Sequence, residues 1–307
     1  MPLRRSQPAV RGFAAVLAHL DDAVLHHWEA TLADIDPEDL HQLRVALRRS
    51  RSVLAAADTI FADETINRFR DDLRWLAGLT GPTRDLDVFI GEWHRYTGEL
   101  GGRSVAALLP VSERLHRHRR EAFEALSDGM RSARAEQLVA AWTDALAEIR
   151  TVDGPIGKLG HRRLARVVRQ RVKAAHRRLV RDGRRITDAS RSTDLHELRK
   201  DAKRLRYLVE CFGGALPKKA TKHFVRRLKS LQDNLGLIQD GSVHRAELGK
   251  IGTELEHEGA SQETIRALGR LTKQIDAATA TARAEFAGHF AAFDSKRTRR
   301  VLDRLVG

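Results

Sequence analysis

The chain has 307 residues, of which 42% are hydrophobic, so it can bury a sizeable core without disulfides or metals. The 55 Lys and Arg residues against 41 Asp and Glu residues give a formal net charge of +14, which points to anionic partners. Cys211 is the only cysteine, which excludes an intramolecular disulfide and a thiolate metal cluster and fits a reducing cytosol.

The first half is predicted to be helical. The composition is rich in Ala, Leu, Arg and Glu, with only 7 Pro residues, and Leu43, Leu47 and Leu54 recur at helical spacing. Residues 1–20 lack a sustained apolar run and a cleavage site, so we expect a cytoplasmic protein without a membrane span. Turn signals predict about four helices, separated at Asp36-Pro37, Gly78 to Pro82, Gly98 to Gly102 and Asp128-Gly129.

The second half follows a connection of Gly, Pro and polar residues at positions 151–160. It opens with a strongly basic helical segment, residues 158–185, and a polar loop is predicted from Asp182 to Asp194. Further breaks are predicted at Gly213-Gly214, Gly236 and Gly259. No stretch shows strand alternation, so the predicted fold class is all-α.

An internal repeat organises the chain. DLHQLRVALRRSRSVL from Asp39 aligns without gaps with DLHELRKDAKRLRYLV from Asp194, at an offset of 155 residues. The same offset carries Asp85 onto Asp240. We therefore predict two related four-helix bundles, residues 1–153 and residues 154–307, that come from an internal duplication and together form one domain.

Each repeat carries a row of basic residues on one helix face. The rows consist of His41, Arg44, Arg48 and Arg51, and of His196, Arg199, Lys203 and Arg206. Each row lies within an arc of about 80° and extends over roughly 15 Å, while Arg49 and Arg204 project from its side. Such a row suits a linear polyanion, inorganic polyphosphate above all, better than one compact ligand.

The two rows border the apolar faces of their helices, so we expect them to line a groove between packed helices. Acidic residues are absent at the positions one turn after His41, Arg44 and Arg48. The crowded cations should lower the pKa of the two histidines, and a bound polyanion should raise it.

The strings HQLRVALRRSR with GPTRDLDV, and HELRKDAKRLR with GLIQDGSV, resemble the CHAD family, the conserved histidine α-helical domain. The resemblance implies two pseudo-symmetric four-helix bundles around a central basic pore that binds polyphosphate. It implies binding roles for the eight residues of the two rows, with Arg74 and Lys229 as further candidates.

The second downstream string departs from the first, because Gln239 replaces Arg84 and Gly241-Ser242 replaces Leu86-Asp87. Some members of the family carry an N-terminal triphosphate-tunnel enzyme domain with an E-x-E-x-K signature. No such signature is present here, which indicates a stand-alone domain.

Other chemistries are less well supported by the sequence. Asp85, Asp87 and Asp240 could hold magnesium in a metal-dependent phosphohydrolase, but their position after Gly-rich turns favours helix N-caps. The histidines of the rows are surrounded by cations, and no phosphate loop, nucleophile elbow or dinucleotide fingerprint occurs. We therefore expect a binding protein with no catalytic residue, metal or cofactor.

Two alternative functions stay open. Nucleic acid is attracted by the same charges, although the rows lack the Asn, Gln and aromatic residues that read or stack bases. A protein-interaction scaffold, attached to polyphosphate granules or to proteins that metabolise polyphosphate, is the other. Arg117, Arg120 and the terminal SKRTRR are predicted to serve solubility.

Overall fold

Helices form all the regular secondary structure in the residues that the computed structural model describes, which are 3–62, 68–151 and 156–307. Two isolated β-bridges, Pro8 with Arg163 and Phe61 with Ile156, are the extended pairings in these residues. The all-α prediction is confirmed. None of these helices is long and apolar enough to cross a membrane.

In the first half, a Pro and its preceding Asp set the start of the second helix. The Asp36 side chain accepts a hydrogen bond from the backbone N–H of Glu38, and Pro37 occupies the first turn, where its missing N–H costs nothing. The helices are α1 (Ala9–Ala33), α2 (Pro37–Ala56), α4 (Phe69–Thr97), α5 (Gly102–Ala107), α6 (Leu109–Met130) and α7 (Ala133–Thr151).

The second half contains α8 (Leu164–Gly183), α9 (Ser192–Cys211), the 3-10 helix η1 (Gly213–Ala215), α10 (Lys218–His257), α11 (Gln262–Phe293) and α12 (Lys296–Val306). The end of α8 and the start of α9 confirm the polar loop between them. Helices α8 and α9 begin 155 residues after α1 and α2, which is the offset of the sequence repeat.

Two predicted breaks are wrong. Gly78 to Pro82 lies inside α4, and Gly236 lies inside α10, so each of these helices continues where the sequence signals a turn. The flanking side chains of α4, among them Leu76 and Phe89, are buried. Their packing outweighs a Gly penalty of about 1 kcal/mol and the missing N–H of Pro82.

Apolar contacts join the two predicted halves at both ends of the molecule. Near the chain termini, the ring centroid of Phe13 on α1 lies 4.4 Å from that of Phe212, just after α9. At the opposite end, Phe89 of α4 stacks on His244 of α10 at 4.2 Å. The boundary between residues 153 and 154 lies outside the described residues, and the division into two bundles stays a prediction.

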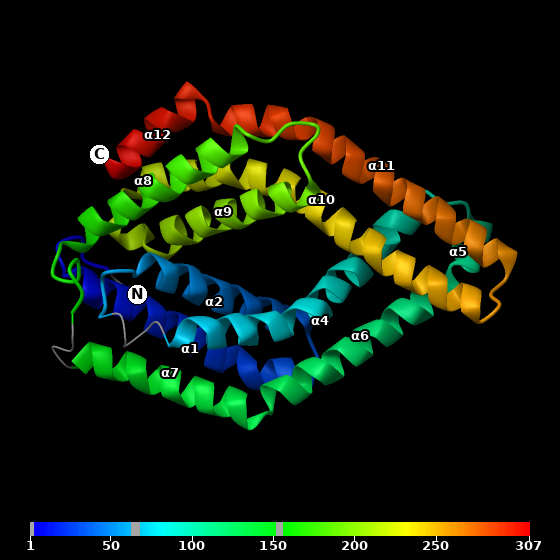
Figure 1. The fold of residues 1–307 in the computed structure, drawn as a ribbon, viewed down its shortest axis with the longest axis horizontal. Coiled ribbons are helices and arrows are strands. Elements are labelled where there is room, and N and C mark those ends of the chain that lie inside the picture. The colour runs from blue at the N-terminus through cyan, green and yellow to red at the C-terminus, as the bar shows by residue number, and fades with distance from the viewer. Residues whose placement is uncertain (1–2, 63–67, 152–155) are drawn as a thin grey trace.

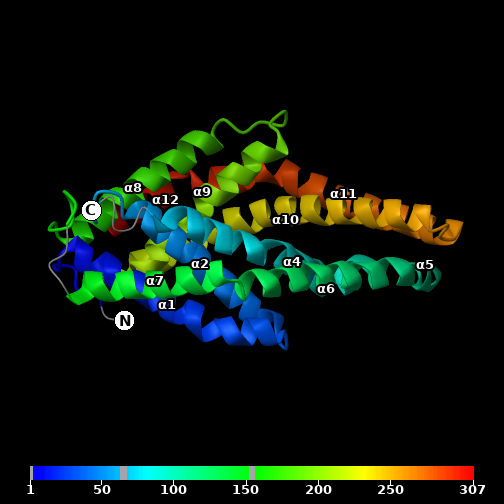
Figure 2. The ribbon, with the colours of Figure 1, turned by 60° about the horizontal axis from the view of Figure 1, so that its bottom comes forward.

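The helices pack in the same order in both halves. Helix α1 packs on α2, α2 on α4 and α4 on α6, while α8 packs on α9, α9 on α10 and α10 on α11. Helix α7 covers α1, and α12 covers α8. Both termini lie at one end, and the tips of α6, α10 and α11 lie at the other (Figure 1 and Figure 2). Helix α2 packs against α9, so the two helices that carry the basic rows are neighbours.

Candidate functional site

The basic rows of α2 and α9 approach each other closely enough to affect one another's ionisation. Burial lowers the pKa of Arg44 to about 10, and the field of Arg48 and of Arg199 on α9 adds to the effect. Burial also lowers the pKa of His41, with contributions that include Lys203 from α9. The lowered pKa predicted for His41 is therefore confirmed, with burial as the larger cause.

A cavity of about 580 Å³ lies where α2, α4 and α9 meet, and we call it the basic pocket. Its lining contains no Asp or Glu among the residues that the structure describes. The cationic lining residues are Arg48 and Arg51 of α2, Arg70 and Arg74 of α4, and Arg199, Lys200, Lys203 and Arg204 of α9. His196 and Tyr207 complete the α9 wall. A continuous pore through the molecule stays a prediction.

Arg44 and Arg199, which occupy matching positions of the repeat, are each held by a carboxylate from the next helix. Arg44 donates to the Thr80 hydroxyl at 3.0 Å and lies 3.6 Å from Asp85 Oδ1 on α4. Arg199 lies 3.4 Å from Asp240 Oδ1 on α10. The rows are thus partly neutralised by acids from other helices, which residue spacing along α2 and α9 does not reveal.

The same geometry overturns the helix-cap prediction for the three aspartates. Asp85 and Asp87 lie inside α4 and Asp240 lies inside α10, so none caps a helix. Asp87 instead accepts a hydrogen bond from Arg119 Nε at 3.0 Å. Within the described residues no three His, Cys, Asp or Glu side chains are grouped so that they could hold a metal ion.

Three cations of the rows have side chains that form no ion pair or hydrogen bond in the described part of the chain: Arg48, Arg51 and Lys203. The field of Asp240 still acts on Lys203. Burial, with smaller contributions from Arg199 and Arg48, lowers the pKa of Lys203 from 10.5 to about 7. Burial also lowers the pKa of Arg51. The pocket therefore keeps cations partly away from water while carboxylates compensate them only in part, which is unfavourable until an anion enters.

The two histidines have different neighbours because the downstream strings differ. Arg84 is, after burial, the largest cause that lowers the pKa of His41. At the matching position of the second half, Gln239 Oε1 accepts a hydrogen bond from His196 Nδ1 at 2.5 Å. The nearby replacement by Gly241 also has a reason, since a Cβ there would lie 2.0 Å from the Thr279 hydroxyl of α11.

Several predicted residues lie outside the basic pocket or at its edge. Arg49 and Arg206 both bind Glu210, at 2.9 and 2.6 Å. Lys229 is exposed on α10 and does not line the pocket. Arg74 lines it, although its side chain is 67% exposed and pairs with Asp71.

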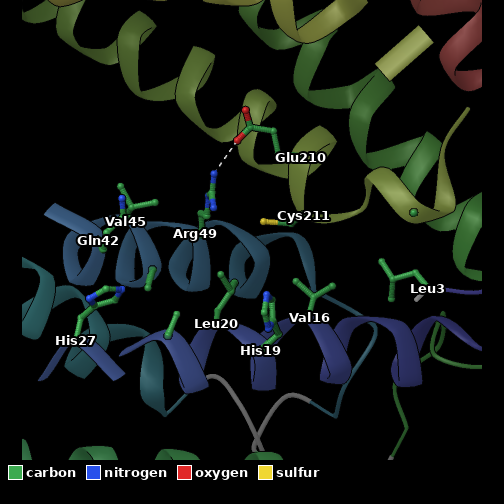
Figure 3. A pocket seen from close by; sticks show the side chains of 13 residues that line it. Leu3, Val16, His19, Leu20, His27, Gln42, Val45, Arg49, Glu210 and Cys211 are labelled. Atoms are coloured by element: carbon green, nitrogen blue, oxygen red, sulfur yellow. Dashed lines mark hydrogen bonds and ion pairs between the residues drawn. The ribbon is translucent and has the colours of Figure 1, made fainter. Parts of the chain in front are cut away.

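A second cavity, of about 430 Å³, contains Arg49 and lies between α1, α2 and the end of α9 (Figure 3). Its walls combine apolar side chains with His19, His27 and Glu210, and the Arg49–Glu210 pair crosses it. Burial raises the pKa of the Cys211 thiol in this wall to about 11, so it is a poor nucleophile.

Sequence reasoning missed Arg70, Lys200 and Tyr207 as pocket residues. Arg70 precedes Arg74 by one helical turn, and Lys200 is adjacent to Arg199, so helical spacing held a signal for both. The carboxylate partners Asp85 and Asp240 were visible as a matched pair in the repeat, but their contact with Arg44 and Arg199 requires the packing of α2 on α4 and of α9 on α10.

The fold and the site define an all-α protein in which packed helices surround a basic pocket. The family model of the CHAD domain matches residues 14–249, which include every residue of the basic pocket. The chain belongs to the CHAD domain family.

Solved structures with the same fold include the CHAD domain from the plant Ricinus communis, with a TM-score of 0.68 and 24% identity over 99% of this chain and 95% of that one. PptA from Streptomyces chartreusis has a TM-score of 0.70 and 19% identity over 92% of this chain and 99% of that one. The uncharacterized Mycobacterium tuberculosis proteins MT2285 and Rv2226 are 27% identical over 252 residues, 81% of this chain. This chain spans about half of their length, 47%.

Proposed function

We propose that the chain binds inorganic polyphosphate in the basic pocket and carries out no chemistry on it. One observation carries the proposal: eight Lys and Arg side chains from three helices line a single cavity whose described lining has no carboxylate. Guanidinium and ammonium groups donate charge-assisted hydrogen bonds to phosphate oxygens, and such bonds are stronger where water is partly excluded.

A linear ligand fits the arrangement better than a compact one. Arg48 and Arg51 on α2 and Arg199 and Lys203 on α9 follow the axes of two neighbouring helices, so donors succeed one another along a track. Successive phosphates of one chain could each meet a cation. His196 at the α9 wall would add a donor.

The free protein keeps this track in an unfavourable state. Lys203, with its pKa of about 7, is close to half neutral at pH 7. Burial also lowers the pKa of Arg199. A bound polyanion reverses the sign of the local field, restores the proton of Lys203 and relieves the repulsion. Part of the binding energy therefore comes from the crowding of cations that folding imposes.

Nucleic acid is a weaker candidate for this pocket. A volume of about 580 Å³ is that of a small-molecule site and is too small for a duplex. Tyr207 is the one aromatic side chain among the described lining residues, so stacking of successive bases is not supported. A metal-dependent phosphohydrolase lacks support too, since the described residues of the lining offer no carboxylate to hold a metal.

A cytoplasmic location and attachment to polyphosphate granules would follow from this function, as would contacts with proteins that metabolise polyphosphate.

The test is a competition titration in which polyphosphates of graded length, a DNA duplex, single-stranded RNA and ATP displace a labelled polyphosphate from the whole chain. We expect long polyphosphate to compete best and ATP least, because each added phosphate meets a further cation. If the duplex or the RNA competes as well as polyphosphate or better, the proposal is wrong and nucleic acid is the ligand of this pocket.

A further inference from the structure

The net charge of the chain is concentrated on three helical segments that do not form the basic pocket. Helix α8, helix α12 and residues 218–230 of α10 carry formal charges of +6, +4 and +6. Their total of +16 exceeds the +14 of the whole chain, so the rest of the protein is close to neutral. We call these three segments the outer basic surface.

The three segments are neighbours, because α12 packs against both α8 and α10. Arg227 of α10 donates to the Thr298 hydroxyl of α12 at 3.4 Å, and Leu305 and Val306 of α12 are buried beneath it. Helices α8 and α12 lie at the end of the molecule that holds the termini (Figure 1).

Many cations of this surface are free. Twelve of them are exposed and have no side-chain hydrogen bond or ion pair with any described residue, among them Arg166, Lys173 and Arg177 of α8, Lys222 and Arg226 of α10, and Arg297 and Arg300 of α12. Asp182 and Asp303 are the acids on these segments. Because these cations are exposed, water solvates them in the free protein. Each one therefore attracts a partner only weakly, and binding depends on the combined charge of many of them.

The fold does not require this charge. Helix α1 starts 155 residues before α8, packs on α2 as α8 packs on α9, and carries a formal charge of −2. Two helices with the same packing role thus differ by eight charges, and only the second half carries the basic exterior. A general need for solubility would not confine the charge to one half.

The outer basic surface lacks the features of a membrane-inserting face. The large exposed apolar side chains of the described chain are Leu25, Ile35, Val105, Leu109 and Leu237, and none lies on these three segments. A strongly cationic surface without large exposed apolar side chains fits a partner that presents a dense, hydrophilic array of phosphates.

The size of the surface indicates a broad partner. Helix α8 is roughly 30 Å long at about 1.5 Å per residue, and neighbouring helix axes lie about 8–10 Å apart, so three packed helices present an area much wider than one extended chain. A nucleic-acid duplex carries one negative charge per about 1.7 Å of its axis, and it is broad enough to contact several neighbouring helices at once. We propose that the outer basic surface binds double-stranded nucleic acid through its phosphate backbone, independently of sequence and separately from the basic pocket.

The experiment measures binding of a short fluorescent DNA duplex of arbitrary sequence to the whole chain at several salt concentrations. The test variant combines Lys173→Glu, Lys222→Glu and Arg300→Glu, one change on each segment. The matched control combines Arg103→Glu, Arg120→Glu and Lys273→Glu, which are also exposed cations without a partner among the described residues. Both variants change the net charge equally, and a second test variant with Ala at the same three positions guards against misfolding.

We expect the test variants to lose at least about tenfold in duplex affinity and to reduce the salt dependence by about three released counterions, while the control changes little. The variant Arg48→Glu/Lys203→Glu should keep duplex binding, and the test variants should keep polyphosphate binding. These two results separate this proposal from the proposed function, because each site is judged by its own ligand.

Equal losses in test and control variants would overturn the proposal, since net charge alone would then explain binding. Loss of duplex binding in the Arg48→Glu/Lys203→Glu variant would move the duplex to the basic pocket. If the chain binds anionic lipid vesicles but not the duplex, the partner is a membrane and the proposal is wrong. Polyphosphate that displaces the duplex from the outer basic surface more effectively than DNA does would assign the surface to a second polyphosphate chain.

Discussion

The basic pocket and the outer basic surface are both rich in Lys and Arg, yet the packing around them gives the two regions different properties. In the pocket, burial and neighbouring cations lower the pKa of Arg199 and Lys203. On the outer surface, cations such as Lys173 and Arg300 are exposed. The outer surface carries more charges than the pocket, but the access of water decides how strongly each charge depends on a ligand.

The largest expected effect is the loss of polyphosphate binding on charge reversal in the pocket. Each hydrogen bond between a charged donor and phosphate is worth about 1.5–3 kcal/mol, so Arg48→Glu with Lys203→Glu should weaken binding by at least about a hundredfold. The same reversal at Lys173 and Arg300 should change it by less than about threefold. Isothermal titration with polyphosphate measures both. Equal losses would show that the two regions act as one site.

The pH dependence should also differ between the two regions. Below pH 7 Lys203 is charged in the free pocket, and above its pKa of about 7 the pocket must take up a proton to bind polyphosphate. Affinity should therefore fall above pH 7, by up to about tenfold per pH unit. Duplex binding at the outer surface should stay flat over this range. Lys203→Met should abolish the slope, and a slope that survives in this variant would assign it to another group.

The lowered pKa of Lys203 should also make the free energy of unfolding depend on pH, and here the effect is an increase with pH. The pKa of Lys203 is about 7 in the folded chain and 10.5 in its unperturbed state, so the unfolded chain binds more protons between these values. The contribution of Lys203 to the free energy of unfolding should rise from pH 7 towards pH 10. Urea unfolding of the wild type and of Lys203→Met measures the difference. A wild-type stability that falls relative to the variant over this range would contradict the lowered pKa.

The smallest expected effect concerns the carboxylates that hold the pocket arginines. Asp240→Asn removes the partner of Arg199, which should lower the free energy of unfolding by about 1 kcal/mol. The same change should tighten polyphosphate binding several-fold, since one competing negative charge is lost. Chemical unfolding and titration of one preparation measure both. Asp303→Asn on the outer surface is the control, and weaker polyphosphate binding in Asp240→Asn would mean that Asp240 mainly orders Arg199 for the ligand.

Helical spacing and the repeat predicted more of this site than turn signals did. Helical spacing places Arg48 on one basic helix face and Arg199 and Lys203 on the other, and the structure brings all three into one cavity. The helix breaks predicted at Pro82 and Gly236 are wrong, because Gly and Pro affect only a few backbone dihedrals. Buried side chains along the whole length of α4 and α10 stabilise these helices. The prediction that Asp85, Asp87 and Asp240 cap helices is wrong for the same reason, because the helix breaks that it assumed do not occur.

By itself, the sequence determined the all-α class, the repeat offset that places α2 and α9, and the identity of the residues on their basic faces, since helical periodicity depends only on local spacing. The tertiary structure alone decided that Asp85 and Asp240 meet Arg44 and Arg199, that Arg49 and Arg206 meet Glu210, and that Arg70 joins the pocket. Ion pairing and burial depend on which helices pack together, and contacts between residues far apart in the chain set both.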